Sequence, residues 1–327
     1  MAKVDLIIPA YNAHETLDRT IGSIIMQTVR DDIVVTIADD ASPNGAYDDI
    51  VQRYSGILKI QSLRLPINGG PGVARQYAID RTNCEYMMFM DADDTLASSF
   101  AVEIMLLAMV QKPDTIAVFG SFSEETESGF TIHEKDSVWM HGKMYLRSYW
   151  TENGIRFHET SRANEDNGVN SIIKLTAANM GKKIVVIPDV LYYWHYMPNS
   201  ITRNNDHSYY FTSSYKGYVE NMVYAIKKAT EILGGATDEI ARHAAMVLCF
   251  LFCYWSETVQ YQPELADTNK RACKVFYDEV YRDLASRVSY EEFSSLHSSQ
   301  IAASQARFPH YIPTETIFQF ISDIKKG

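Results

Sequence analysis

The sequence is poor in cysteine, and its few cysteines form no familiar metal or redox motif. They are Cys84, Cys249, Cys253 and Cys273, with no Cys-x-x-Cys pair and no accompanying histidine cluster. This spacing disfavours both the disulfide framework of a small secreted domain and a structural zinc site. We therefore expect reduced, structural thiols in a cytoplasmic protein.

Long hydrophobic runs are also missing. The longest apolar stretch, AAMVLCFLFCYW at residues 244–255, is much shorter than the roughly 20 residues that a bilayer-spanning helix needs. We expect it to form a buried helix. The opening residues MAKVDLIIPA contain too short an apolar segment for a signal peptide, and they predict a strand instead. The sequence thus predicts neither a membrane span nor a secretion signal.

Positive charge is in deficit. The chain has 30 Lys and Arg residues against 41 Asp and Glu residues, so its net charge is -11. Generic binding to a polyanion needs a basic surface, which disfavours DNA as a partner. A local basic group in the last third of the chain keeps that alternative open. Its members are Lys227, Lys228, Lys270, Arg271 and Lys274.

The first part of the chain alternates between apolar, β-branched runs and segments with helical spacing. Strands are expected at residues 4–9, 33–40, 57–65, 85–90, 115–122 and 184–187, and helices at 12–27, 71–80, 96–111 and from about 166. Asn12 is the expected N-cap of the first helix. This alternation predicts an α/β fold with a mainly parallel sheet covered on both faces. We expect one domain at residues 1–205 and a helical region at 206–327.

Acidic residues follow two of the expected strands. Asp39 and Asp40 end one strand, and Asp91, Asp93 and Asp94 follow another in the segment MDADD. Ligands of such sheets bind beyond the carboxyl ends of the strands. Carboxylates so close together repel each other, so a positive partner is expected beside them. Carboxylates without neighbouring His or Cys suit Mg²⁺ or Mn²⁺, although a turn that caps the next helix would also use Asp.

Three other segments could take part in chemistry. Asp39 and Asp40 could accept hydrogen bonds from a nucleobase or a ribose, or could simply be solvated. The stretch NGGPGVAR at 68–75 allows close approach of the backbone to a ligand, with Arg75 able to reach an anion; the alternative is a tight turn. Glu165 and Asp166 open a helix, where either a general base or plain helix capping is expected.

Taken in order, these segments resemble a known family. IIPAYN, ADDAS, NGGPGVAR, MDADD, NED and YYWHYMPNSIT follow each other as in the family-2 glycosyltransferases of GT-A fold, over residues 3–205. The resemblance implies a nucleotide-diphospho-sugar transferase with a Rossmann-like sheet, in which the helical region at 206–327 would serve acceptor binding or homo-oligomer formation. It also implies roles for individual residues. Those expected to bind the nucleotide and donor are Pro9, Tyr11, Asn12, Glu15, Asp39, Asp40, Gly70, Arg75, Asp91 and Ala92.

The resemblance further implies a metal site and a catalytic base. Asp91 and Asp93 would hold Mn²⁺ or Mg²⁺ on the diphosphate, and Asp166 would take the proton of the acceptor hydroxyl in an inverting transfer. One position departs from the family pattern. Aligning Ser200 and Thr202 puts Met197 where relatives carry a histidine, so His195 is the expected phosphate or metal contact, or else a structural ring.

The expected function is therefore metal-dependent, inverting transfer of a sugar from a UDP-sugar to a hydroxyl of a glycan or cell-surface polymer. Acceptors of another kind, such as a modified DNA base or a protein, remain alternatives, as does a nucleotide-sugar-binding module without turnover. A nucleotidyltransferase is disfavoured, because AYNAHE after the first strand lacks the Gly-rich loop with Lys or Arg that holds a triphosphate.

Overall fold

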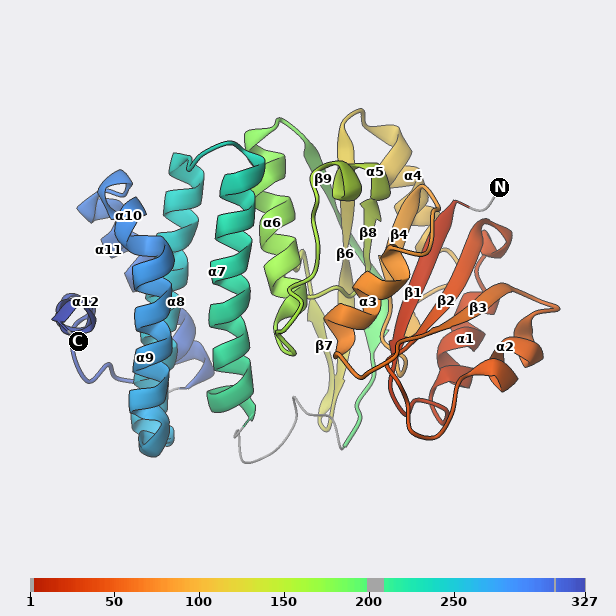
Figure 1. Ribbon diagram of the computed structural model, residues 1–327, viewed down its shortest axis with the longest axis horizontal. Coiled ribbons are helices and arrows are strands. Elements are labelled where there is room, and N and C mark those ends of the chain that lie inside the picture. The colour runs from red at the N-terminus through yellow and green to blue at the C-terminus, as the bar shows by residue number, and fades with distance from the viewer. Residues whose placement is uncertain (1–2, 199–208, 309, 327) are drawn as a thin grey trace. The chain divides into compact units, whose positions relative to one another are not determined.

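The structure is a computed structural model that describes residues 3–198, 209–308 and 310–326. The chain divides into two compact units, which we call the sheet unit and the helical unit (Figure 1). The sheet unit comprises the chain up to Arg162 together with Met180–Pro198, and the helical unit comprises Ala163–Asn179 and the described residues after 208. The sequence predicts a single boundary near residue 205, whereas in the structure 163–179 groups with the later helices. No helix in the described ranges is long and apolar enough to cross a membrane.

One mixed sheet forms the sheet unit, with strand order β3-β2-β1-β4-β8-β6-β9-β5 and β7 paired to β6. The strands are β1 Val4–Ala10, β2 Ile33–Asp39, β3 Lys59–Arg64, β4 Tyr86–Phe89, β5 Thr95–Leu96, β6 Thr115–Thr126, β7 Gly129–His133, β8 Lys143–Leu146 and β9 Lys183–Trp194. Strands β3, β2, β1 and β4 are parallel, as predicted. The other half is mixed, because β8 runs antiparallel to both β4 and β6, while β9 runs parallel to β6.

Five α-helices within the described residues belong to the sheet unit, and α1 packs on the sheet through the apolar spacing visible in the sequence. They are α1 Leu17–Ile25, α2 Asp48–Tyr54, α3 Pro71–Ile79, α4 Ala101–Gln111 and α5 Arg147–Glu152. Leu17, Ile21 and Ile24 of α1 are fully buried in one core cluster with Leu6 and Ile8 of β1. Each such side chain contributes about 1.5–3 kcal/mol of transfer free energy. Spacings of three and four residues in the helix and two in the strand therefore define this interface.

Four local predictions are wrong at their boundaries. Helix α1 has Thr16 as its N-cap, and Asn12 lies ahead of it with a φ of 53°. Helix α4 starts at residue 101 instead of 96, because Thr95 and Leu96 pair with β9. The strand predicted at 115–122 is longer in the structure, since β6 continues to Thr126 and turns back into β7. Strand β9 likewise extends well beyond the predicted 184–187.

The helical unit is built from α6 Glu165–Asn179, α7 Tyr215–Ile232, α8 Asp238–Tyr261, α9 Ala266–Phe276, α10 Arg282–Leu284, α11 Tyr290–Arg307 and α12 Ile317–Lys326. Helix α7 packs against α6, α8 and α9, as Figure 1 shows. The apolar run at 244–255 forms the middle of α8 and is largely buried, which confirms its prediction as a buried helix. All four cysteines of the chain are buried and unpaired.

Candidate active site

The carboxyl ends of β1, β2 and β4 lie at one edge of the sheet. The register pairs Ala10 with Asp39 and Ile7 with Phe89, so the segments that follow these three strands emerge side by side. The sheet topology thus brings Tyr11, Asp40 and Asp91 to one rim, as the sequence predicts. Among the other predicted donor residues, Pro9 is half-buried in β1, while Tyr11, Asn12 and Glu15 are exposed. Their roles in binding a nucleotide stay predictions.

Asp40 fastens the end of β2 to the start of α3. Its carboxylate accepts hydrogen bonds from the backbone N–H groups of Gly69 at 2.7 Å and Gly70 at 2.8 Å. Burial raises the pKa of Asp40, and these two bonds act in the opposite direction. Gly70 has a φ of 91°, and a Cβ there would lie 3.3 Å from Cγ of Arg162, so a larger residue would be strained. The role of Asp40 toward a nucleobase stays a prediction.

Asp39 holds the turn after β2. Its carboxylate is fully buried, pairs with Arg64 and accepts a hydrogen bond of 2.9 Å from the backbone N–H of Ser42. Ser42 in turn accepts a bond of 3.1 Å from the backbone N–H of Asn12, which links the segments after β1 and β2. The structure therefore gives Asp39 a fold-stabilising role beside the predicted one.

Residues 91–94, which we call the acidic turn, are held by two side chains of α1. The hydroxyl of Thr20 donates to the carbonyl of Ala92 at 2.9 Å, and the guanidinium of Arg19 donates to the carbonyl of Asp93. Ala92 is buried, whereas the side chain of Asp93 is partly exposed. The turn closes on itself through a bond of 3.2 Å from the backbone N–H of Asp94 to the carbonyl of Asp91. Its carboxylates are therefore presented by a fixed backbone.

Asp91 has a positive partner within the protein. Nη2 of Arg75 lies 2.7 Å from Oδ1 of Asp91, and Nε2 of His141 lies 3.5 Å from Oδ2. Burial alone would raise the pKa of Asp91, but the charge of Arg75 and the hydrogen bond from His141 hold it well below its usual range. Arg75, which is itself buried, thus supplies part of the positive charge that the sequence requires.

Asp94 is the most enclosed carboxylate of the acidic turn. The hydroxyl of Tyr192 donates to its Oδ2 at 2.6 Å, and the backbone N–H of His195 donates to its Oδ1 at 2.9 Å. Tyr192 also accepts a bond of 3.0 Å from the backbone N–H of Asp91. Burial first, and then the charges of Asp91 and Asp93, raise the pKa of Asp94 well above its usual value. A nearby cation would offset the repulsion between these carboxylates and lower the pKa of Asp94.

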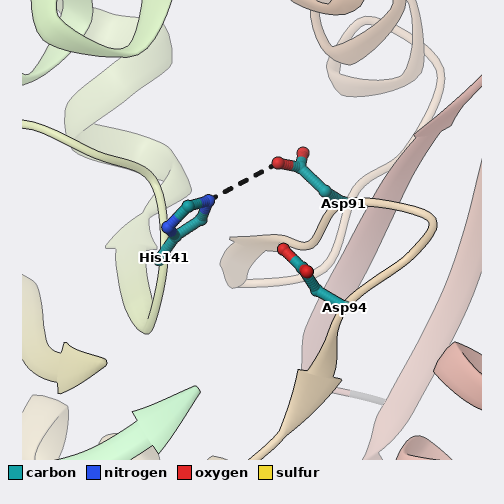
Figure 2. A group of neighbouring side chains, drawn as sticks. All are labelled: Asp91, Asp94 and His141. Atoms are coloured by element: carbon teal, nitrogen blue, oxygen red, sulfur yellow. Dashed lines mark ion pairs between the residues drawn. The ribbon is translucent and has the colours of Figure 1, made fainter. Parts of the chain in front are cut away.

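Asp91, Asp94 and His141 form a group that could hold a metal ion (Figure 2). One donor atom from each lies within 4.8 Å of the others. Adjacent ligands of an octahedral ion with bonds of about 2.1 Å are about 3 Å apart and opposite ones about 4 Å, so small side-chain shifts would suffice. Burial lowers the pKa of His141, which favours the neutral imidazole that metals bind. The residues present therefore fit a divalent cation.

His195 contacts the acidic turn through its backbone, while its ring has other partners. Its Nε2 lies 2.8 Å from Oγ1 of Thr95, and its Nδ1 lies 3.2 Å from Oε2 of Glu125. The predicted metal contacts of Asp93 and His195 stay predictions, and the metal-compatible group contains neither residue. Ser200 and Thr202, on which the alignment with the family pattern depends, lie outside the described residues.

Asp166 belongs to the helical unit, in the first turn of α6. Its Oδ1 accepts a bond of 2.8 Å from the backbone N–H of Asn167, and its side chain is partly exposed. The preceding Asn164 has a φ of 59° and donates to the carbonyl of Ser214 at 2.9 Å, which sets where α6 begins. Burial, followed by the charges of Glu165 and Asp166, raises the pKa of Tyr209 to about 12. The role of Asp166 as a base stays a prediction.

Two residues at the rim have no role in the sequence-based prediction. His141 occurs in WMHGKMY, where an isolated histidine among aromatic residues carries no distinctive signal. Tyr192 lies in an aromatic stretch whose members could equally be packing residues. Both residues reach the acidic turn because β8 lies beside β4 and β9 pairs with β5, and the sequence pattern does not reveal these pairings.

Comparison with known proteins shows that the chain is similar in sequence to named glycosyltransferases. Residues 5–164 match the family model described as glycosyl transferase family 2. A poly(ribitol-phosphate) beta-glucosyltransferase of Bacillus spizizenii is 26% identical over 244 residues, which are 69% of this chain but only 37% of that protein. The poly(ribitol-phosphate) beta-N-acetylglucosaminyltransferase TarP of Staphylococcus aureus is 25% identical over 267 residues, covering 74% of this chain and 80% of TarP.

Solved structures with the same fold include two sugar transferases. S. aureus TarS 1-349 in complex with UDP-GlcNAc matches with a TM-score of 0.63 and 17% identity, covering 94% of this chain and 91% of that one. The mannosyltransferase PcManGT from Pyrobaculum calidifontis, in complex with GDP-Man and Mn²⁺, matches with a TM-score of 0.55 and 16% identity, covering 94% and 81%. At these identities the likeness shows the fold.

Proposed function

The chain belongs to glycosyl transferase family 2 and is a glycosyltransferase of GT-A fold, and from this premise we propose that it transfers a sugar from a UDP-sugar to a hydroxyl group of a surface polymer. The observation that carries the proposal is the rim where β1, β2 and β4 end, with the acidic turn at its centre. The names of the two curated relatives favour a polyol-phosphate acceptor. The UDP-GlcNAc complex of TarS favours that donor class.

Within this proposal each predicted residue has a task. Asp40 and Arg75 would bind the nucleotide portion of the donor, and Asp91 and Asp93, together with the neighbouring Asp94, would carry the divalent cation. Such a cation, when bound, neutralises the charge that grows on the diphosphate leaving group. Asp166 would remove the proton of the acceptor hydroxyl as it attacks, so that the anomeric centre is inverted. We also propose a cytoplasmic location, in keeping with four unpaired cysteines.

Donor binding is tested by thermal unfolding of the full chain with UDP, UDP-GlcNAc, UDP-glucose and GDP-mannose, each with and without MnCl₂. A ligand present at 100 times its Kd stabilises the native state by about 2.7 kcal/mol, which raises Tm measurably. We expect UDP and a UDP-sugar to raise Tm more in the presence of Mn²⁺. The variant Asp91→Asn should lose the metal-dependent part. Its matched control is Asp80→Asn, which also removes an arginine-paired carboxylate but lies at the C-cap of α3.

Turnover is tested separately by measuring UDP release with a poly(ribitol phosphate) acceptor. Donor-dependent stabilisation together with acceptor-stimulated UDP release supports a transferase. Stabilisation with no UDP release from any donor would favour the alternative of a binding module without turnover. If no nucleotide sugar shifts Tm, the proposed function is wrong.

A further inference from the structure

We propose that His141 is the nitrogen ligand of the cation site and makes the site prefer Mn²⁺ to Mg²⁺, and that Asp136 and Lys143 hold its ring in position. This proposal rests on the proposed function and specifies which ion the donor site takes. The structure places an imidazole, rather than a third carboxylate, beside Asp91 and Asp94. That difference in donor chemistry is the basis of the preference.

The two histidines near the acidic turn differ in whether a ring nitrogen is available to bind a cation. Both ring nitrogens of His195 lie within 3.2 Å of side-chain oxygens, those of Thr95 and Glu125. In His141, Nε2 faces Asp91, and Nδ1 has no hydrogen-bond partner among the described residues. Nε2 contacts Asp91, which is itself a candidate ligand, and in the neutral tautomer protonated at Nδ1 this nitrogen presents its lone pair to a cation. His141 is therefore the better placed nitrogen donor.

Aromatic packing fixes the plane of the His141 ring. The ring stacks on Tyr192 with centroids 4.7 Å apart and an interplanar angle of 9°, and it lies parallel to Trp139 at 5.9 Å. Phe122 meets it edge-on at 4.9 Å. Tyr192 also donates its hydroxyl to Asp94, so one residue orients two of the three donors. Such preorganisation reduces the entropy lost when an ion binds.

An ion pair between Asp136 and Lys143 closes the segment that carries His141. Oδ1 of Asp136 accepts bonds from the backbone N–H groups of Val138 at 3.0 Å and Trp139 at 2.9 Å, and it lies 3.2 Å from Nζ of Lys143. The side chain of Lys143 is fully buried at the start of β8. The pair therefore joins both ends of the segment around His141. Asp136 and Lys143 act through His141 and are positioning residues.

The choice between the two ions follows from ligand chemistry. Mg²⁺ is a hard ion that favours oxygen ligands and gives up its water reluctantly, so an imidazole in its coordination sphere is unfavourable. First-row transition ions bind imidazole more readily. A site with two carboxylates and one imidazole should therefore discriminate in favour of Mn²⁺. Removing the nitrogen should weaken Mn²⁺ binding far more than Mg²⁺ binding.

The test measures ion binding to the full chain saturated with UDP, without any turnover. Electron paramagnetic resonance of free Mn²⁺ gives its Kd, competition gives the Kd of Mg²⁺, and pulsed measurements report nitrogen coupled to bound Mn²⁺. The variant His141→Phe keeps an aromatic ring in the stack but removes the nitrogen. Its matched control is His133→Phe, because His133 also stacks on Phe122, with centroids 4.4 Å apart.

We expect the wild type and His133→Phe to show nitrogen coupling and a clear preference for Mn²⁺. His141→Phe should lose the coupling and bind Mn²⁺ at least about 10-fold more weakly, with a smaller change for Mg²⁺. If the wild type binds UDP and Mn²⁺ but shows no nitrogen coupling, or if coupling survives in His141→Phe, the inference is wrong while the proposed function stands. A wild type that binds no UDP would overturn the proposed function itself.

The positioning role of Asp136 needs a separate pair of variants. Asp136→Ala should weaken Mn²⁺ binding several-fold, because the backbone N–H groups of Val138 and Trp139 lose their acceptor. Asp136→Asn keeps an oxygen acceptor there and should restore most of the affinity and of the preference for Mn²⁺. Equal Mn²⁺ affinity in Asp136→Ala and the wild type would refute the positioning role.

Discussion

Replacing Tyr192 with phenylalanine removes one oxygen atom from the centre of the rim. That hydroxyl donates to Oδ2 of Asp94 at 2.6 Å and accepts the backbone N–H of Asp91 at 3.0 Å. The ring itself is 1% exposed, so water cannot readily replace the missing group. The variant Tyr192→Phe therefore leaves a buried carboxylate and a buried N–H each without one of its partners.

The expected cost can be worked out from these two bonds. A hydrogen bond to a charged group contributes about 1.5–3 kcal/mol, and a neutral one about 1 kcal/mol. We therefore expect Tyr192→Phe to lower the free energy of unfolding by about 2.5–4 kcal/mol. Because Tyr192 orients Asp94, the affinity for Mn²⁺ should also fall, by about 10- to 100-fold if the cation binds there.

Urea unfolding followed by circular dichroism measures the first effect, and Mn²⁺ titration in the presence of UDP measures the second. The matched control is Tyr145→Phe. Tyr145 is also 1% exposed and lies in β8 of the same sheet, but its hydroxyl contacts the sulfur of Met140 at 3.0 Å. We expect a much smaller loss there. Equal losses in the two variants would refute the special role of the Tyr192 hydroxyl.

Three further predictions concern single side chains. Asp93→Ala should abolish metal-stimulated UDP release and leave the circular dichroism spectrum unchanged, because the side chain is partly exposed; wild-type rates would contradict its assignment. Asp166→Asn should keep the Tm shift with UDP-sugar but lose transfer to the acceptor, and continued transfer would place the base elsewhere. Burial lowers the pKa of His243 to about 4, so protonation of the unfolded chain destabilises the fold as pH drops below about 6.5. The loss is about 2 kcal/mol between pH 7 and pH 5, and urea unfolding of His243→Gln should lack this contribution; an unchanged pH dependence would contradict it.

The parallel half of the sheet could be predicted, because strands that are close in the sequence there also lie close in space. Strands β1 and β2 read as apolar, β-branched runs, and β1 is followed by a helix with clear apolar spacing. Parallel strands joined in this way place their carboxyl ends at one edge, so Asp39, Asp40 and Asp91 could be assigned to a common rim from the sequence. Short-range patterns were sufficient there.

The pairing in the mixed half of the sheet could not be predicted, because several of its strands are short and they pair with residues far away in the sequence. Strand β8 has four residues, β5 has two, and β7 is exposed and polar enough to resemble a loop. The pairing of Thr95 with Tyr193 joins positions that no local pattern connects. As a consequence, the contacts of His141 and Tyr192 with the acidic turn could not be inferred from spacing, although both residues shape the candidate site.

The electrostatics of the acidic turn explain why the sequence predicts a need for positive charge but does not predict every group that supplies it. Clustered carboxylates within four consecutive residues show that compensation is needed, but they do not show which groups provide it. In the structure the compensation comes from α3 through Arg75, from the segment before β8 through His141, and from β9 through Tyr192. The need is local and can be read from the sequence, whereas the groups that meet it are brought in by the fold. These neighbours still leave Asp94 with a raised pKa, and this unmet demand for positive charge is the physical reason to expect a cation at this site.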